Sequence, residues 1–338
     1  MGLVIDFIAN DGSPLGVTEQ SIIGLDGRNG VGGAELALLT VCRGLHDKGH
    51  KVTVYNNPTV VGGSVFEHKK LDEFNPQAER DILIVFRSPN ERAKGAKGKK
   101  IWWSCDQYTI GDFRAFAQHV DKIVCISPFH ANYFKTIYGI RDVEVIDIPV
   151  RTWEYGNPLV KKRNSCIFTS VPDRGLMALL PIWDRIVEQV PDASLTITSD
   201  WSLWSGQNVS GAVSSYRLAW AGKKNVMYKG AVKREELVKI QSAADYHLYP
   251  CTYEELFCIS VAESQVAGAT PITSRVGALE TTNRFGYKID GNPTSQEFQD
   301  RFVETTVKLM TTMRPVYNTK KEFSLDTILL QWESLFNG

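Results

Sequence analysis

Short apolar runs alternate with amphipathic stretches along the first 150 residues. The two stretches at 34–50 and 128–139 have helical periodicity, and Gly49 stands where a helix of the first stretch would end. The runs suit strands that are buried on both faces of a parallel sheet. They are LVIDFI (3–8), KVTVY (51–55), DILIVF (81–86), KKIWWS (99–104), DKIVCIS (121–127) and VEVIDIP (143–149). This alternation predicts a doubly wound α/β sheet.

A second series of the same kind follows a polar, turn-rich linker at 150–163. Helices are predicted near 174–189, 233–243 and 256–267, and a closing amphipathic helix within 324–338. The expected strands are SCIFTS (165–170), ASLTITS (193–199), NVMYKG (225–230), DYHLYP (245–250) and TPITS (270–274). We therefore predict an N-terminal Rossmann-like domain over 1–155 and a C-terminal one over 156–315. The segment 316–338 is expected to pack back toward the N-terminal domain.

Composition narrows the classes of protein. Lys plus Arg is 38 and Asp plus Glu is 38, so the formal net charge is zero, which argues against bulk attraction to nucleic acid or to an acidic membrane. The six cysteines form no CxxC pair and are expected to be reduced core thiols. No apolar run reaches the length of a membrane span. We expect a cytoplasmic protein with at most peripheral membrane contact.

A glycine-rich loop, GRNGVGGAE at 27–35, opens the first long helix. Free backbone amides at a helix N-terminus attract phosphate, and glycine lets a ligand approach closely. The loop does not complete a dinucleotide fingerprint, because Glu35 stands at the third glycine position, and the chain has no Gly-Lys-Ser/Thr triplet of a P-loop. From the residues alone, the loop at 27–35 can equally well be interpreted as a phosphate-binding site or as a flexible surface loop.

Arg174 precedes a helix that is expected to begin near Leu176, just after the first strand of the second domain. A guanidinium in this position can form paired hydrogen bonds with a phosphate held at the helix end. The alternative is a surface arginine that closes a turn.

Glu255 and Glu263 lie in the apolar segment YEELFCISVAESQVAGATPITS (253–274). In a continuous helix, their positions would be ~12 Å apart along the axis and ~80° apart in rotation. That separation is too wide for an acid–base pair across one glycosidic bond, but it suits the two ends of an elongated ligand with hydroxyl groups at each end. Two solvated helix residues are the alternative.

In combination, these motifs resemble the retaining nucleotide-sugar glycosyltransferases of the GT-B fold, glycosyltransferase family 4. The resemblance rests on GGAE (32–35) with GHKVTVY (49–55), on TSVPDRGL (169–176), and on the E-x7-E segment from Glu255 to Glu263 with the turn that follows it. It implies two Rossmann-like doubly wound domains that face an interdomain cleft.

The resemblance also implies site residues. Glu255 would bind hydroxyls of the transferred sugar, and Glu263 would bind the ribose. Arg174 would hold the diphosphate, together with backbone amides near Gly32 and Gly33 and at the helix start by Phe257, Cys258 and Ile259. Asp106 follows Cys105 in the strand-end loop that touches the sugar in relatives, and we place it with Glu255 and Arg174 as a catalytic candidate.

The chain departs from the commoner family pattern at three places. Thr169 stands where many relatives have an arginine, which leaves one cation fewer. Leu256 and Cys258 stand where many have glycine, and Cys105 stands where many have histidine.

The implied function is transfer of a sugar from a nucleoside diphosphate sugar, a UDP-sugar by default, to an acceptor hydroxyl with retention of configuration. No cofactor and no metal are expected. The acceptor would be a glycan, a lipid carrier or a small molecule. Alternatives are a nucleotide-sugar epimerase on the same fold and a non-catalytic protein that binds nucleotide sugars or glycans.

Overall fold

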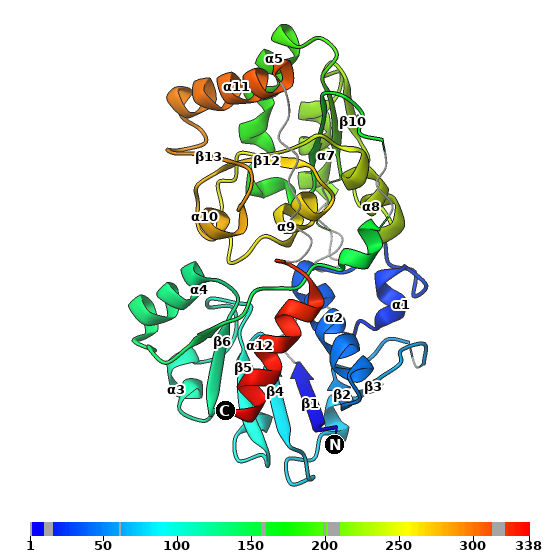
Figure 1. Cartoon of the computed structure of the whole chain (residues 1–338), viewed down its shortest axis with the longest axis vertical. Coiled ribbons are helices and arrows are strands. Elements are labelled where there is room, and N and C mark those ends of the chain that lie inside the picture. The colour runs from blue at the N-terminus through cyan, green and yellow to red at the C-terminus, as the bar shows by residue number, and fades with distance from the viewer. Residues whose placement is uncertain are drawn as a thin grey trace. The chain divides into compact units, whose positions relative to one another are not determined.

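A computed structural model describes residues 2–9, 16–60, 62–156, 160–198, 201, 210–312 and 322–338. Its contacts divide the chain into two units (Figure 1). The first unit contains Met1–Arg151 and Phe323–Gly338, and the second contains Thr152–Glu322. The boundary predicted at 315/316 lies outside the described residues.

The first unit has a seven-stranded parallel sheet in the order β3-β2-β1-β4-β5-β6-β7. Its strands are β1 (Val4–Ala9), β2 (Lys51–Tyr55), β3 (Glu67–Lys69), β4 (Ile82–Phe86), β5 (Lys99–Trp103), β6 (Lys122–Cys125) and β7 (Glu144–Val145). The winding direction changes between β1 and β4, because β2 and β3 extend the sheet to one side and the later strands to the other. The central strand β4 is buried at every residue, as its continuous apolar run predicts.

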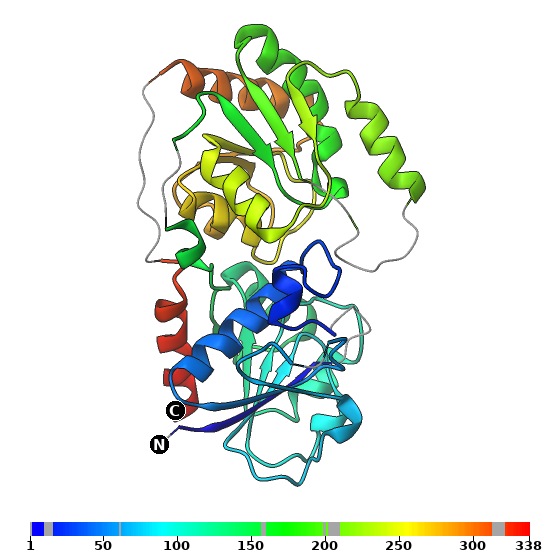
Figure 2. The ribbon, with the colours of Figure 1, turned by 90° about the vertical axis from the view of Figure 1, so that its right-hand side faces the viewer.

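The α-helices of the first unit are α1 (Glu19–Ile22), α2 (Gly33–Asp47), α3 (Phe113–Ala117), α4 (Pro128–Tyr133) and α12 (Leu325–Asn337). Helix α12 comes from the far end of the chain and packs beside α2, as Figures 1 and 2 show. The two helices approach closely at Gly44, where an added Cβ would lie 2.6 Å from the Leu329 side chain. Helix α2 ends before Gly49, whose φ of 89° confirms the predicted stop.

The second unit has a six-stranded parallel sheet in the order β10-β9-β8-β11-β12-β13. Its strands are β8 (Ser165–Phe168), β9 (Ser194–Ile197), β10 (Val226–Tyr228), β11 (Tyr246–Tyr249), β12 (Thr270–Ser274) and β13 (Tyr287–Ile289). Its winding direction changes between β8 and β11, so the two units repeat one doubly wound plan.

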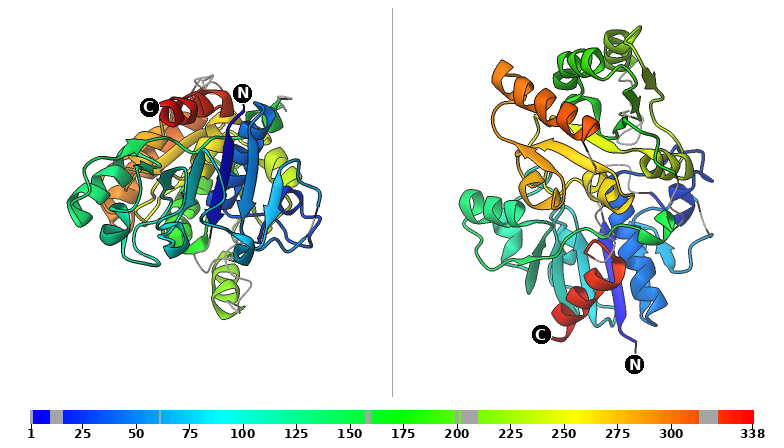
Figure 3. Two further views of the ribbon diagram at one scale, coloured as in Figure 1. Left: turned by 90° about the horizontal axis from the view of Figure 1, so that it is seen from below. Right: turned by 45° about the horizontal axis from the view of Figure 1, so that its top comes forward.

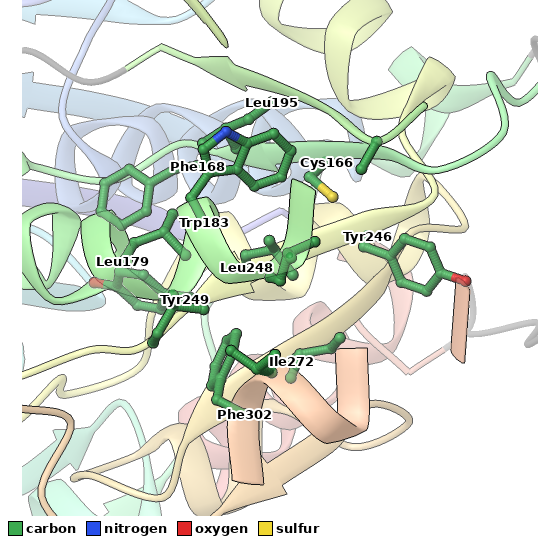
Figure 4. Packing of buried hydrophobic residues seen from close by; sticks show 14 of the residues in the cluster. Cys166, Phe168, Leu179, Trp183, Leu195, Tyr246, Leu248, Tyr249, Ile272 and Phe302 are labelled. Carbon is green, nitrogen blue, oxygen red and sulfur yellow. The ribbon is translucent and has the colours of Figure 1, made fainter. Parts of the chain in front are cut away.

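Among its described residues, the α-helices of the second unit are α5 (Leu176–Gln189), α7 (Ser210–Trp220), α8 (Arg234–Ala243), α9 (Ile259–Val266), α10 (Leu279–Thr282) and α11 (Gln296–Thr311). Helices α5 and α11 lie side by side (Figures 1 and 3). Trp183 of α5 and Phe302 of α11 belong to the same buried cluster as Leu248 of β11 (Figure 4). The cluster fixes the middle strands of the sheet, and therefore the loops at their carboxyl ends.

Several elements differ from the sequence-based expectation. Strands β3 and β13 and helix α11 were not predicted. The stretch at 128–139 is α4 followed by a π-helical turn, Phe134–Tyr138. Helix α9 begins only at Ile259, so residues 255–258 are not helical, and the axial distance expected for a continuous helix from Glu255 does not apply.

Candidate active site

The carboxyl ends of β8 and β11 meet where the second sheet changes its winding direction. The two strands pair in parallel, with Tyr246 opposite Cys166. Ligands of open α/β sheets bind outside the carboxyl ends of the strands at such a point. The polar side chains that follow these two strands therefore define the candidate site.

Glu255 is the centre of a group of hydrogen-bonded side chains at this point. Arg174 Nη1 donates to its Oε2 over 2.8 Å, and the Tyr249 hydroxyl donates to its Oε1 over 2.6 Å. The Ser170 and Tyr249 hydroxyls are 2.9 Å apart, and Ser170 is the donor because the Tyr249 proton is given to Glu255. Two segments that are distant in the sequence, 170–174 and 249–255, thus meet at one carboxylate.

Arg174 lies against an aromatic ring. Its guanidinium carbon is 4.4 Å from the centroid of the Tyr253 ring, which supports the planar group from one side. Burial opposes the charge on Arg174, but the nearby Glu255 carboxylate outweighs it and raises the pKa of the guanidinium above its usual range. Arg174 therefore stays cationic although its side chain is only 16% exposed.

The loop after β12 fixes the backbone of Glu255. The Ala278 amide donates to the Glu255 carbonyl over 2.7 Å. Gly277, at a φ of 58°, lies so close that an added Cβ would come within 2.8 Å of the Glu255 nitrogen and 2.7 Å of its carbonyl oxygen. A side chain at position 277 would displace the residue that carries the carboxylate.

Helix α9 begins close to this group. Its N-cap residue is Cys258, whose φ of 73° lies in the left-handed region that non-glycine residues rarely adopt. No side chain caps α9. The Val261 amide donates to the Cys258 carbonyl over 3.2 Å, whereas the two amides before it, of Ile259 and Ser260, precede the first intrahelical hydrogen bond. These amides and the helix dipole favour an anion at this end. The unusual φ coincides with one of the positions at which, by the resemblance, many relatives have glycine.

Glu263 lies inside α9 and belongs to a second ionic group. Its Oε1 is 2.7 Å from Arg234 Nη1, and its Oε2 accepts from Gln241 Nε2 over 3.1 Å. Arg234 also binds Glu154, with Nε to Oε2 at 2.8 Å, and its Nη2 is 3.4 Å from the Tyr155 hydroxyl. Each of the two glutamates is thus held by one arginine and one neutral donor.

The alternative in which both glutamates are solvated helix residues is wrong. Glu255 is 5% exposed and Glu263 is 3% exposed, and only Glu263 lies in the helix. The structure brings Arg174 and Glu255 together and gives Glu263 a separate cation. Arg234 and Tyr253 were not identified from the sequence, because no local motif shows that Arg234 meets α9 or that Tyr253 lies beneath Arg174.

In the first unit, the predicted glycines lie at the start of α2, next to a carboxylate. Gly32 is the N-cap of the helix, and an added Cβ there would lie 2.4 Å from Glu35 Oε2. Arg87 Nη2 donates to the other oxygen of Glu35 over 2.6 Å. The binding of a phosphate by the amides of Gly32 and Gly33 stays a prediction.

Asp106 organises its own loop after β5. One carboxylate oxygen accepts from the Gln107 amide over 2.7 Å and from the Thr109 hydroxyl over 2.6 Å, and the other accepts from the Thr109 amide over 3.0 Å. Its carbonyl accepts from His130 Nε2 over 2.9 Å. These contacts give Asp106 a clear structural task, and a catalytic role stays a prediction.

Neighbouring Cys105 is a neutral thiol in this setting, because burial raises its pKa far above the usual value.

Across the described ranges, no group of three or more His, Cys, Asp or Glu side chains is arranged to hold a metal ion. In the same part of the chain, no helix is long and apolar enough to cross a membrane.

Comparison with known proteins identifies the fold. No protein-family model matches the sequence, and no curated protein matches it. Solved structures do match. A glycosyltransferase from Rickettsia africae is similar with a TM-score of 0.65 at 13% identity, over 99% of this chain and 98% of that chain. AviGT4, a glycosyltransferase involved in avilamycin A biosynthesis, is similar with a TM-score of 0.68 at 15% identity, over 99% and 97% of the two chains.

HepE from Anabaena, solved in complex with UDP-glucose, is similar with a TM-score of 0.64 at 12% identity, over 99% of this chain and the whole of that chain. At these identities the likeness defines the fold. The chain has the two-unit α/β architecture of GT-B glycosyltransferases, as the resemblance in the sequence predicted.

Proposed function

We propose that the protein is a glycosyltransferase that moves a sugar from a nucleoside diphosphate sugar to an acceptor hydroxyl, with retention of configuration. The observation that carries the proposal is the Arg174–Glu255 pair at the switch point of the second sheet, beside the start of α9. The fold shared with glycosyltransferases supports it, and HepE was solved with UDP-glucose.

The pair suits the two parts of such a donor. Glu255 is an acceptor of hydrogen bonds whose position is fixed by Arg174, Tyr249 and its own backbone, so it can accept from sugar hydroxyls without reorganising. Arg174 is a fixed cation with a guanidinium, whose fork of N–H donors suits phosphate oxygens. It would bind the diphosphate, where negative charge grows as the bond to the anomeric carbon breaks.

The backbone amides at the start of α9 would also bind the diphosphate and help to stabilise its negative charge. This is the part in donor binding that we propose for Phe257, Cys258 and Ile259.

Two buried histidines, His130 and His247, are poor acid–base groups for an epimerase. Burial lowers the pKa of His247 to about 3 and that of His130 to about 4, so both are neutral at pH 7. We therefore assign deprotonation of the acceptor hydroxyl to the leaving phosphate rather than to a protein base.

A panel of UDP, GDP, ADP and their sugars tests the proposal. A ligand of the folded state at one hundred times its dissociation constant adds about 2.7 kcal/mol of stability, which a thermal shift detects. The donor found in this way should then be consumed with release of nucleoside diphosphate, and Glu255→Gln should slow the release by about 100-fold while the nucleotide still binds. A protein that binds the donor and never releases nucleotide, with water or with any acceptor offered, would be a binding protein and not an enzyme.

A further inference from the structure

We propose that Glu35, at the start of α2, binds a hydroxyl group of the acceptor, and that the acceptor is a neutral sugar or polyol rather than a phosphorylated compound. The inference rests on the proposed function, because it takes the chain to be a glycosyltransferase and adds the class of the acceptor. It concerns the first unit alone, at the point where the winding direction of its sheet changes between β1 and β4. Ligands of open α/β sheets bind at such points.

One oxygen of the Glu35 carboxylate is fixed, and the other is left without a partner. Oε1 accepts from Arg87 Nη2 over 2.6 Å. Among the described residues, Oε2 accepts no hydrogen bond, and it is not sealed from solvent, although Glu35 as a whole is only 6% exposed. This oxygen points at the start of the helix, because an added Cβ on Gly32 would lie 2.4 Å from it. A nearly buried carboxylate thus keeps one accessible oxygen for a ligand.

Arg87 holds the carboxylate from the loop after β4. Its φ of 69° lies in the left-handed region, which non-glycine residues rarely adopt. The Trp103 carbonyl accepts from the Arg87 amide over 2.8 Å, and Trp102 Nε1 donates to the Arg87 carbonyl over 3.0 Å. Both contacts come from β5, so the sheet itself holds this strained backbone. Strain of this kind is found at ligand sites, and here it directs the arginine toward Glu35.

The start of α2 offers hydrogen-bond donors beside this oxygen. The first intrahelical hydrogen bond runs from the Leu36 amide to the Gly32 carbonyl over 2.9 Å, so the amides at 33–35 precede it. No side chain caps the helix. Gly33 and Ala34 are partly exposed, so a ligand can reach this end of the helix from solvent.

A hydroxyl group fits this combination, because it can donate to Glu35 Oε2 and accept from one of these amides at the same time. A phosphate dianion can only accept, and it would meet the carboxylate as a like charge. Glu35 already supplies the negative charge that a helix start favours. A phosphate at the same amides, which the glycine-rich loop predicts, is therefore the competing occupant, and the test separates the two.

The test measures the release of nucleoside diphosphate from the donor that the ligand panel selects, in water alone and with added acceptors. The acceptors are glucose, galactose, mannose and glycerol, each beside its phosphate monoester. In the wild type, at least one neutral compound should raise the rate of release above that in water. Its kcat/KM should exceed that of its phosphate monoester by about tenfold or more.

Glu35→Gln should raise the KM for that neutral acceptor by about 10- to 100-fold, because the charged partner of a hydrogen bond is lost. The value of kcat, the release in water and the affinity for the donor should each change by less than about threefold. Gly32→Ala is a second variant, in case Glu35→Gln does not fold. The Gly32 φ of −64° suits alanine, and the new Cβ would displace only the far end of the Glu35 side chain. It should raise the same KM by about tenfold.

Asp6→Asn is the matched control. Asp6 is a buried acid of the first unit with the same exposed fraction as Glu35, 6%, and it accepts from Arg80 Nε over 2.7 Å. This variant should lose stability and keep the wild-type KM.

The outcomes separate the two proposals. If the wild type releases no nucleoside diphosphate from any donor, the proposed function fails, and the inference fails with it. If the donor is consumed but no neutral compound raises the rate, or if a phosphate monoester is the better acceptor, the inference is overturned while the proposed function stands. Loss of stability in Glu35→Gln with an unchanged KM would mark a merely structural glutamate and would also overturn the inference.

Discussion

Arg174 and Glu255 are 81 positions apart in the sequence, and their side chains meet at 2.8 Å. The contact joins the loop after β8 to the loop after β11, on the two sides of the point where the second sheet changes its winding direction. A cation and an anion held together there can bind a ligand that carries both phosphates and hydroxyls.

The first prediction concerns the dependence of the two residues on each other. Arg174→Gln and Glu255→Gln should each lower kcat/KM for donor consumption by about 100-fold, since each removes a group that we propose to contact the reacting donor. The double variant should be little worse than either single variant, because removing one partner already misplaces the other. Steady-state kinetics of the four proteins measures this. A double variant near the product of the two losses would show that the residues act independently.

A second prediction tests the support of Glu255 by Gly277. Gly277→Ala should abolish donor consumption, because its Cβ would collide with the Glu255 backbone. Gly139→Ala is the matched control. Its φ is 72° and an added Cβ has no atom within 4 Å, so it should cost only the left-handed strain of about 1–2 kcal/mol and leave activity intact. Activity and denaturant unfolding are measured on both. Full activity in Gly277→Ala would contradict the positioning role.

The third prediction concerns the N-cap of α9. Cys258→Gly should change the free energy of unfolding by less than about 1 kcal/mol, because relief from the left-handed φ offsets the lost packing of the thiol. Cys258→Val should destabilise by about 2 kcal/mol more, since a β-branched residue is strongly disfavoured at this φ. Urea unfolding of the two variants gives the difference. Equal stabilities would mean that residue 258 does not hold the left-handed conformation.

Much of the fold could be predicted, because buried parallel strands are continuous apolar runs and the β–α rhythm is regular. The edge strands β3 and β13 escaped prediction because, unlike the comparably short edge strands β7 and β10, they do not lie in an apolar run. The roles of Glu255 and Glu263 stay predictions, but the two acids themselves were identified from their spacing and from the family resemblance. Their partners were not, because the contact of Arg234 with Glu263 depends on how α8 packs against α9, and no local pattern specifies that packing.

The fourth prediction concerns stability in acid. His130 is fully buried, and its Nδ1 accepts from the Ile126 amide while its Nε2–H donates to the Asp106 carbonyl. Burial lowers its pKa to about 4 from 6.5, so the unfolded chain takes up a proton at a higher pH than the folded one. Stability should therefore fall as the pH drops from 6.5 toward 4, by about 3 kcal/mol for this residue.

Urea midpoints measured between pH 4 and pH 7 check this. His130→Gln should reduce the pH dependence by about this amount, and the rest should remain because burial also lowers the pKa of His68 to about 4 and that of His247 to about 3. An identical pH dependence in wild type and His130→Gln would contradict the assignment.

Calorimetric titration of the nucleoside diphosphate sugar selected by the ligand panel tests the central claim most directly, with wild type, Arg174→Gln and a control variant side by side. The control is Arg80→Lys, since Arg80 is a buried arginine of the first unit that donates to Asp6 over 2.7 Å. We expect one saturable site in the wild type, an affinity about 10- to 100-fold lower in Arg174→Gln because a charged hydrogen bond to the diphosphate is lost, and wild-type affinity in the control. Unchanged affinity in Arg174→Gln would show that the donor phosphates bind elsewhere, and would contradict the site described for the second unit.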